Sequence, residues 1–159
     1  MVRVSIRTKL LLVIMTLLLI PWMGYQYVRE MKSFALQGQE GLAKTRAAHQ
    51  RNEPYAVAFV DMRMPPGWDG LETIERLWDL DADMQIVICT AYSDYSWDQI
   101  TARLGPSDKL LILKKPFDPA EVQQIATALT RKWQLTQETK LRSEELELNV
   151  LRRTARLRE

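Results

Sequence analysis

Three side chains that could do chemistry each come at or just after the end of a short apolar stretch. They are Asp61 after residues 56–60, Thr90 after residues 86–89 and Lys115 after residues 110–113. Uncharged runs of this length are typical of strands that are buried on both faces. The carboxyl ends of neighbouring parallel strands meet at one edge of a sheet, where open α/β folds bind their ligands. A carboxylate, a hydroxyl and an ammonium group would then share one cleft.

This combination predicts a site that holds a phosphoryl group. An anion attached to Asp61 would accept a hydrogen bond from Thr90 and would be neutralised by Lys115. Taken alone, Asp61 has a simpler interpretation as the residue that starts the Pro/Gly-rich turn after it, because Asp favours turns. The ordered set of three residues favours the site.

Helical patterns separate the three predicted strands. Asp69-Gly70 opens a helix with Leu71, Ile74 and Leu77 on one face. A second helix is predicted over residues 93–104. The last begins at Asp118, with Pro119 at its first position and Glu121 completing a capping box. Strands that alternate with helices predict a parallel α/β sheet.

These motifs resemble those of response regulator receiver domains in bacterial two-component signalling. The resemblance rests on Asp61 with Met64-Pro65 and Asp69-Gly70, on Thr90-Ala91, and on Lys115-Pro116-Phe117. It implies a flavodoxin-like (CheY-like) fold with helices on both faces of the sheet. It also implies that Asp61 is the phosphoacceptor, Thr90 the switch hydroxyl and Lys115 the phosphate-binding lysine. The expected role is a phosphorelay module, not an enzyme, that is phosphorylated by a histidine kinase or a histidine phosphotransfer protein.

The resemblance also implies Mg²⁺, but the acidic pair with which the family holds it is absent. No Asp or Glu precedes Glu30. The remaining expected ligands are the carboxylate of Asp61 and the backbone carbonyl of Arg63. We therefore expect weak or absent Mg²⁺ binding and poor phosphorylation. The alternative function is a degenerate receiver that is not phosphorylated and acts only through protein contacts.

Residues 10–28 contain no charged side chain, follow three basic residues and approach the roughly 20 residues that a membrane-spanning helix needs. We therefore expect a membrane helix, with a signal peptide and a buried strand or core helix as alternatives. Residues 20–31 also resemble the first membrane helix of sensor histidine kinases. With residues 10–28 assigned to a membrane, the receiver sheet would lack its first strand.

This interpretation divides the chain into a hydrophobic segment at 1–32, a truncated receiver at 34–131 and a helical linker or coiled-coil tail at 132–159. It predicts a membrane location, with the receiver in the cytoplasm by family. A basic N-terminus also stays in the cytoplasm, so that a single span would place the receiver on the other side. We explain this conflict by a sensor-kinase start joined to a truncated receiver near residues 34–39.

The C-terminal segment has a weak heptad pattern. Leu141, Leu148 and Ala155 recur every seven residues, and Leu151 falls at a matching position. This favours either a homodimer through this helix or a solvated helical tail.

Composition excludes other functions. Residues 54–118 carry 11 acidic and 6 basic side chains, a net charge of −5, which argues against nucleic-acid binding. A hydrolase of the haloacid dehalogenase type would need a second acid two residues after Asp61, where this chain has Arg63. The single cysteine, Cys89, excludes an internal disulfide and is expected to be a buried strand residue.

Overall fold

The computed structural model describes residues 9–13, 33–64, 66–91 and 96–156. In chain order the elements are β1 (Lys9–Val13), β2 (Ser33–Ala35), α2 (Gly38–Gln50), β3 (Tyr55–Asp61), α3 (Gly70–Leu80), β4 (Gln85–Thr90), α4 (Trp97–Leu104), β5 (Leu110–Lys114) and α5 (Pro119–Arg156). All strand pairs are parallel, and the strand order is β2-β1-β3-β4-β5. This is the flavodoxin-like order, so the predicted α/β fold is confirmed.

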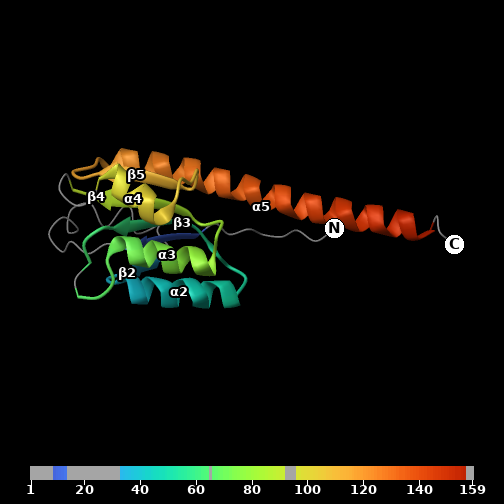
Figure 1. Ribbon diagram of the computed structural model, residues 1–159, viewed down its shortest axis with the longest axis horizontal. Coiled ribbons are helices and arrows are strands. Elements are labelled where there is room, and N and C mark those ends of the chain that lie inside the picture. Colours follow the sequence, from blue (N-terminus) through green and yellow to red (C-terminus); the bar gives the residue numbers. More distant parts are fainter. Residues whose placement is uncertain (1–8, 14–32, 65, 92–95, 157–159) are drawn as a thin grey trace.

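Helices cover both faces of the sheet. α5 lies along one face, and α2 and α3 lie on the other (Figure 1). Successive residues of a strand point to opposite faces. In β3, Phe59 therefore packs in the apolar cluster beneath α5, whereas Val60 packs in the cluster beneath α2 and α3. Every residue of β3 and β4 is buried, which explains the apolar runs at residues 56–60 and 86–89 of the sequence.

The prediction that the sheet lacks its first strand is wrong. β1 lies between β2 and β3, at the position that the fold requires of a first strand. Its register places Val13 beside Val60, the residue before Asp61. The chain therefore completes its sheet with the start of the apolar N-terminal segment, and the argument for a truncated receiver is removed.

The predicted membrane location is also corrected. Residues 10–13 form part of a hydrogen-bonded strand, which a membrane helix over residues 10–28 cannot contain. Among the residues that the structure describes, no helix combines the length and the apolar character needed to cross a bilayer. The rest of the predicted span, and most of the segment resembling a kinase membrane helix, lie outside the described residues. The first few residues of an uncharged run fit a buried strand as well as the start of a membrane helix.

Side chains cap the helices at the predicted starts. Asp69 precedes α3 and accepts a hydrogen bond from the backbone N–H of Glu72 at 2.8 Å. Asp118 precedes α5 and accepts from the N–H of Ala120 at 2.7 Å, while Glu121 accepts from the N–H of Asp118 at 2.8 Å. Such caps satisfy backbone donors that the first turn of a helix leaves unpaired.

α5 is the longest element, with 38 residues. Its first half packs on the sheet as far as Trp133, which is 3% exposed. Its second half extends beyond the sheet (Figure 1). The long C-terminal helix is thus confirmed, whereas the predicted division into 1–32, 34–131 and 132–159 stays a prediction.

Candidate functional site

The carboxyl ends of three adjacent strands bring the predicted site residues together. Asp61 ends β3, Thr90 ends β4 and Lys115 directly follows β5. The Nζ atom of Lys115 lies 2.5 Å from Oδ2 of Asp61. Asp61 is 3% exposed, and the side chain of Lys115 is 27% exposed. The carboxylate is therefore buried beneath a lysine that still reaches solvent.

Thr90 lies between these two residues in the strand order. It is buried, and its backbone carbonyl accepts a hydrogen bond of 2.8 Å from the N–H of Lys115. Its hydroxyl donates to the carbonyl of Ala91 at 3.0 Å. The rotation of one side-chain bond would redirect that hydroxyl. The structure thus places all three predicted residues at one edge of the sheet.

The loop after β3 returns close to the carboxylate. The N–H of Arg63 donates to Oδ1 of Asp61 at 3.2 Å. Gly70 begins α3 against the end of this strand, and its N–H donates to the carbonyl of Met62 at 3.2 Å. A Cβ atom at Gly70 would lie 2.6 Å from the carbonyl oxygen of Asp61 and 2.8 Å from Cα of Met62. Only glycine permits this close approach.

Cys89 lies next to the site, and its thiol pKa is affected by the site's charges. It pairs with Asp61 across β3 and β4 and is fully buried. Burial raises the pKa of its thiol to about 12, with the charge of Lys115 lowering the pKa and that of Asp61 raising it. The thiol therefore stays protonated at neutral pH. Cys89 is the buried strand residue that the sequence predicted.

The described residues fit a magnesium ion poorly. The ligands that the resemblance implies are the carboxylate of Asp61 and the backbone carbonyl of Arg63, and the carboxylate is already paired with Lys115. No group of three or more His, Cys, Asp or Glu side chains suited to a metal occurs in the part of the chain that the structure describes. Mg²⁺ requires near-octahedral oxygen coordination. Two protein oxygens, one of them beside an ammonium group, are a weak basis for it.

Sequence reasoning missed an ion-pair network beside the site. Arg103 of α4 donates two hydrogen bonds of 2.8 Å to the carboxylate of Glu75 in α3. Arg103 also lies 3.8 Å from the carboxylate of Asp69, the cap of α3. The network joins α4 to the loop that follows Asp61. A separation of 28 residues between Arg103 and Glu75 left no local pattern to detect.

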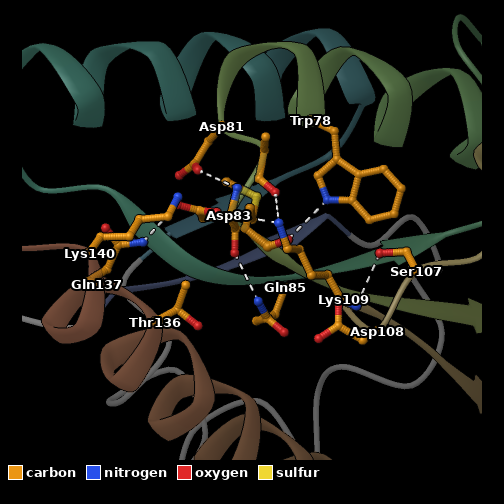
Figure 2. Close-up of polar contacts among 12 residues, drawn as sticks. Trp78, Asp81, Asp83, Gln85, Ser107, Asp108, Lys109, Thr136, Gln137 and Lys140 are labelled. Carbon is orange, nitrogen blue, oxygen red and sulfur yellow. Dashed lines mark hydrogen bonds and ion pairs between the residues drawn. The ribbon is translucent and has the colours of Figure 1, made fainter. Parts of the chain in front are cut away.

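A second carboxylate centre, also missed, lies at the opposite edge of the sheet. Asp83 precedes β4 and binds Lys140 and Gln137 of α5, the latter at 3.1 Å (Figure 2). It also accepts from Lys109 at 3.4 Å. Burial raises the pKa of Asp83, but hydrogen bonds from Lys140 and Gln137 and the positive charge of Lys140 bring the pKa below its ordinary value. We call Asp83, Lys109, Gln137 and Lys140 the Asp83 cluster.

Comparisons with known proteins agree with this geometry. The family model described as the response regulator receiver domain matches residues 13–127. The transcriptional regulatory protein TctD of Salmonella typhimurium is 33% identical over 93 residues, which cover 58% of this chain and 39% of TctD. The sporulation initiation phosphotransferase F of Bacillus subtilis is 33% identical over 67 residues, 42% of this chain and 51% of that protein. The chain thus spans only 39% and 51% of the lengths of these two curated relatives.

Solved structures share the fold. A structure described as adenylate cyclase from Rhodopirellula baltica has a TM-score of 0.69 at 20% identity, covering 86% of this chain and 96% of that one. The REC domain of AraT, a response regulator from Geobacillus stearothermophilus, has a TM-score of 0.61 at 23% identity, covering 82% and 98%. Because the family model covers more than half of the sequence, the chain belongs to the response regulator receiver domain family of two-component signalling.

Proposed function

We propose that this chain is a receiver module that accepts a phosphoryl group on Asp61 from a histidine kinase or a histidine phosphotransfer protein. The observation that carries the proposal is the 2.5 Å contact between the ammonium group of Lys115 and the carboxylate of Asp61. Receiver domains in general are not enzymes, so the proposed role is signal transfer and not turnover of a substrate.

In the proposed reaction, a carboxylate oxygen of Asp61 attacks the phosphorus atom of a phosphohistidine. The new P–O bond forms as the P–N bond breaks, and the electron pair of that bond stays on the departing imidazole. Lys115 offsets the charge of the transferred group, and the hydroxyl of Thr90 turns from Ala91 to a phosphoryl oxygen. Positioning and charge neutralisation supply most of the catalysis in phosphoryl transfer. No step is assigned to Mg²⁺, because the described donor set fits it poorly.

Labelling the full chain with phosphoramidate tests the proposal. Intact-mass and peptide mass spectrometry should locate one phosphoryl group on Asp61, at low yield. Asp61→Asn should abolish labelling, whereas Asp79→Asn, which changes an exposed carboxylate of α3, should leave the yield unchanged. Modification that persists in Asp61→Asn would contradict the assignment.

A degenerate receiver is the second candidate, and the absence of acid before Glu30 favours it. Val13 pairs with Val60, the residue before Asp61, and we therefore add an acid at the next position of the sequence, Ile14. In Ile14→Asp we expect Mg²⁺ to raise the labelling rate at least tenfold, against less than threefold in the wild type. A folded wild-type chain that is never labelled, with or without Mg²⁺, would decide for the degenerate receiver.

We also propose that two copies associate through α5. The weak heptad pattern of Leu141, Leu148 and Ala155, with Leu151 at a matching position, supports this association, which does not depend on phosphorylation.

A further inference from the structure

The two chain segments that leave the proposed site are joined to each other by one side chain. The segment after Asp61 leads to Asp69, the cap of α3, and the segment after Thr90 leads to α4. Arg103 of α4 donates a hydrogen bond of 2.8 Å from Nε and another from Nη2 to the carboxylate of Glu75 in α3. Its third nitrogen, Nη1, lies 3.8 Å from Oδ2 of Asp69. Glu75 thus orients the guanidinium group so that it also faces the cap of α3.

The start of α3 is coupled to the backbone of the proposed phosphoacceptor. A Cβ atom at Gly70 would lie 2.6 Å from the carbonyl oxygen of Asp61, so a shift of α3 toward the strand would displace Asp61. A shift in the other direction would break the hydrogen bond from the N–H of Gly70 to the carbonyl of Met62. The position of Asp69, one residue before Gly70, is therefore transmitted to the end of β3.

The hydroxyl of Thr90 is in contact with the segment that leads to α4. It donates at 3.0 Å to the carbonyl of Ala91, the first residue of that segment. α4 itself buries little, because Ile100 is the one buried residue among its eight, all of which the structure describes. The position of such a helix depends on its polar contacts, and the two hydrogen bonds from the planar guanidinium of Arg103 fix both distance and direction.

The exposure of the network argues against a main role in stability. The side chains of Arg103, Glu75 and Asp69 are 41%, 38% and 37% exposed. Ion pairs between side chains this exposed contribute little to the free energy of unfolding. What the network does provide is a fixed geometry between α3 and α4.

We propose that Arg103 is a positioning residue for phosphoryl transfer, which keeps the hydroxyl of Thr90 in register with the carboxylate of Asp61. Arg103 itself contacts no reacting atom. It acts through the start of α3 on one side and through α4 and the segment beginning at Ala91 on the other. The inference rests on the proposed function, because it concerns the rate at which Asp61 is phosphorylated.

Phosphoramidate labelling of full-length single and double variants tests this role. Arg103→Gln removes the charge and the forked hydrogen bonds and should slow the labelling of Asp61 about threefold, the scale of one exposed ion pair. Thr90→Ala should slow labelling about tenfold, and adding Arg103→Gln to it should cause no further slowing. If Arg103 acted independently of the hydroxyl, the two effects would multiply. The same threefold slowing with and without Thr90 would therefore overturn the proposal.

Arg51→Gln is the matched control. Arg51 also pairs with an exposed carboxylate, that of Glu53 at 3.8 Å, but both residues precede β3 and lie at the opposite edge of the sheet. This variant should be labelled at the wild-type rate, and urea denaturation should show both single arginine variants to be as stable as the wild type. A wild-type rate in Arg103→Gln would overturn the positioning role and leave the proposed function intact. A wild-type chain that is never labelled on Asp61 would overturn both.

Discussion

The two edges of the sheet each carry a carboxylate bound by a lysine, but the two pairs differ in what surrounds them. Asp61 accepts hydrogen bonds from the ammonium group of Lys115 and from the N–H of Arg63. Both partners closely follow strands of the sheet, Lys115 directly after β5 and Arg63 two residues after β3. Asp83 is bound by two side chains of α5 and by Lys109, the residue before β5. The first arrangement leaves a partly exposed lysine beside the proposed phosphoacceptor. The second ties a helix to the sheet. The same pair of groups thus has a proposed role in phosphoryl transfer at one edge, whereas at the other edge it attaches a helix to the sheet.

The largest expected difference between the edges concerns phosphoryl transfer. Lys115→Met removes the positive charge beside Asp61 and should slow labelling by about a hundredfold, the scale seen when one preorganised charge or donor is lost from a reaction site. Lys140→Met removes the corresponding lysine at Asp83 and should change the rate less than twofold. Phosphoramidate labelling followed over time measures both rates. Equal slowing in the two variants would remove the functional distinction between the edges.

Gly70→Ala should damage the Asp61 edge through packing. The added methyl group would lie 2.6 Å from the backbone oxygen of Asp61, so that α3 or the strand end must move. We expect a loss of about 2 kcal/mol in the free energy of unfolding, in the range found for overpacked sites. Urea denaturation measures the stability, and labelling of the folded variant measures the site. A variant as stable as the wild type would show that α3 can begin without the close contact between Gly70 and the backbone of Asp61.

The smallest expected effect concerns the Asp83 edge and pH. Asp83→Asn should lower the free energy of unfolding at pH 7 by about 1 kcal/mol, since the carboxylate accepts charged hydrogen bonds but remains in partial contact with water. The folded pKa is lowered from 3.8, so the stabilisation is complete above that value and is lost as the pH falls through the folded pKa. Urea denaturation at several pH values should therefore show the variant and the wild type converging in acid.

Asp108→Asn is the matched control for that experiment. Its carboxylate pairs with Lys132 of α5 at 2.8 Å but is largely exposed to solvent. The substitution should leave the stability at pH 7 unchanged within error. A larger loss of stability in Asp108→Asn than in Asp83→Asn would show that Asp108, and not Asp83, is the main attachment point of α5.

The sequence predicted most of the region from Tyr55 onward because its signals are local. Buried strands appear as uncharged runs, and Asp69 and Asp118 mark helix starts through caps that involve the next few residues. The same rule misled the N-terminal prediction. An uncharged stretch indicates only that the segment avoids water, and the strand pairing is what shows β1 between two neighbouring strands of the sheet.

The site could be predicted only in part for a related reason. Asp61, Thr90 and Lys115 are found from sequence because each comes at the end of a strand. The contacts of Arg103 with Glu75 and of Lys140 with Asp83 join residues 28 and 57 positions apart. Pairings of that kind depend on how helices pack on a sheet, which no local pattern specifies.

The length of α5 has a mechanical consequence. The helix begins four residues after Lys115, passes the Asp83 cluster about 32 Å further on and continues for about 24 Å beyond it. A stiff rod held at such an intermediate point is a lever, and the Asp83 cluster is its fulcrum. A tilt that starts at the edge of the proposed phosphoacceptor would reappear at Arg156 in the opposite direction and at about three quarters of the amplitude.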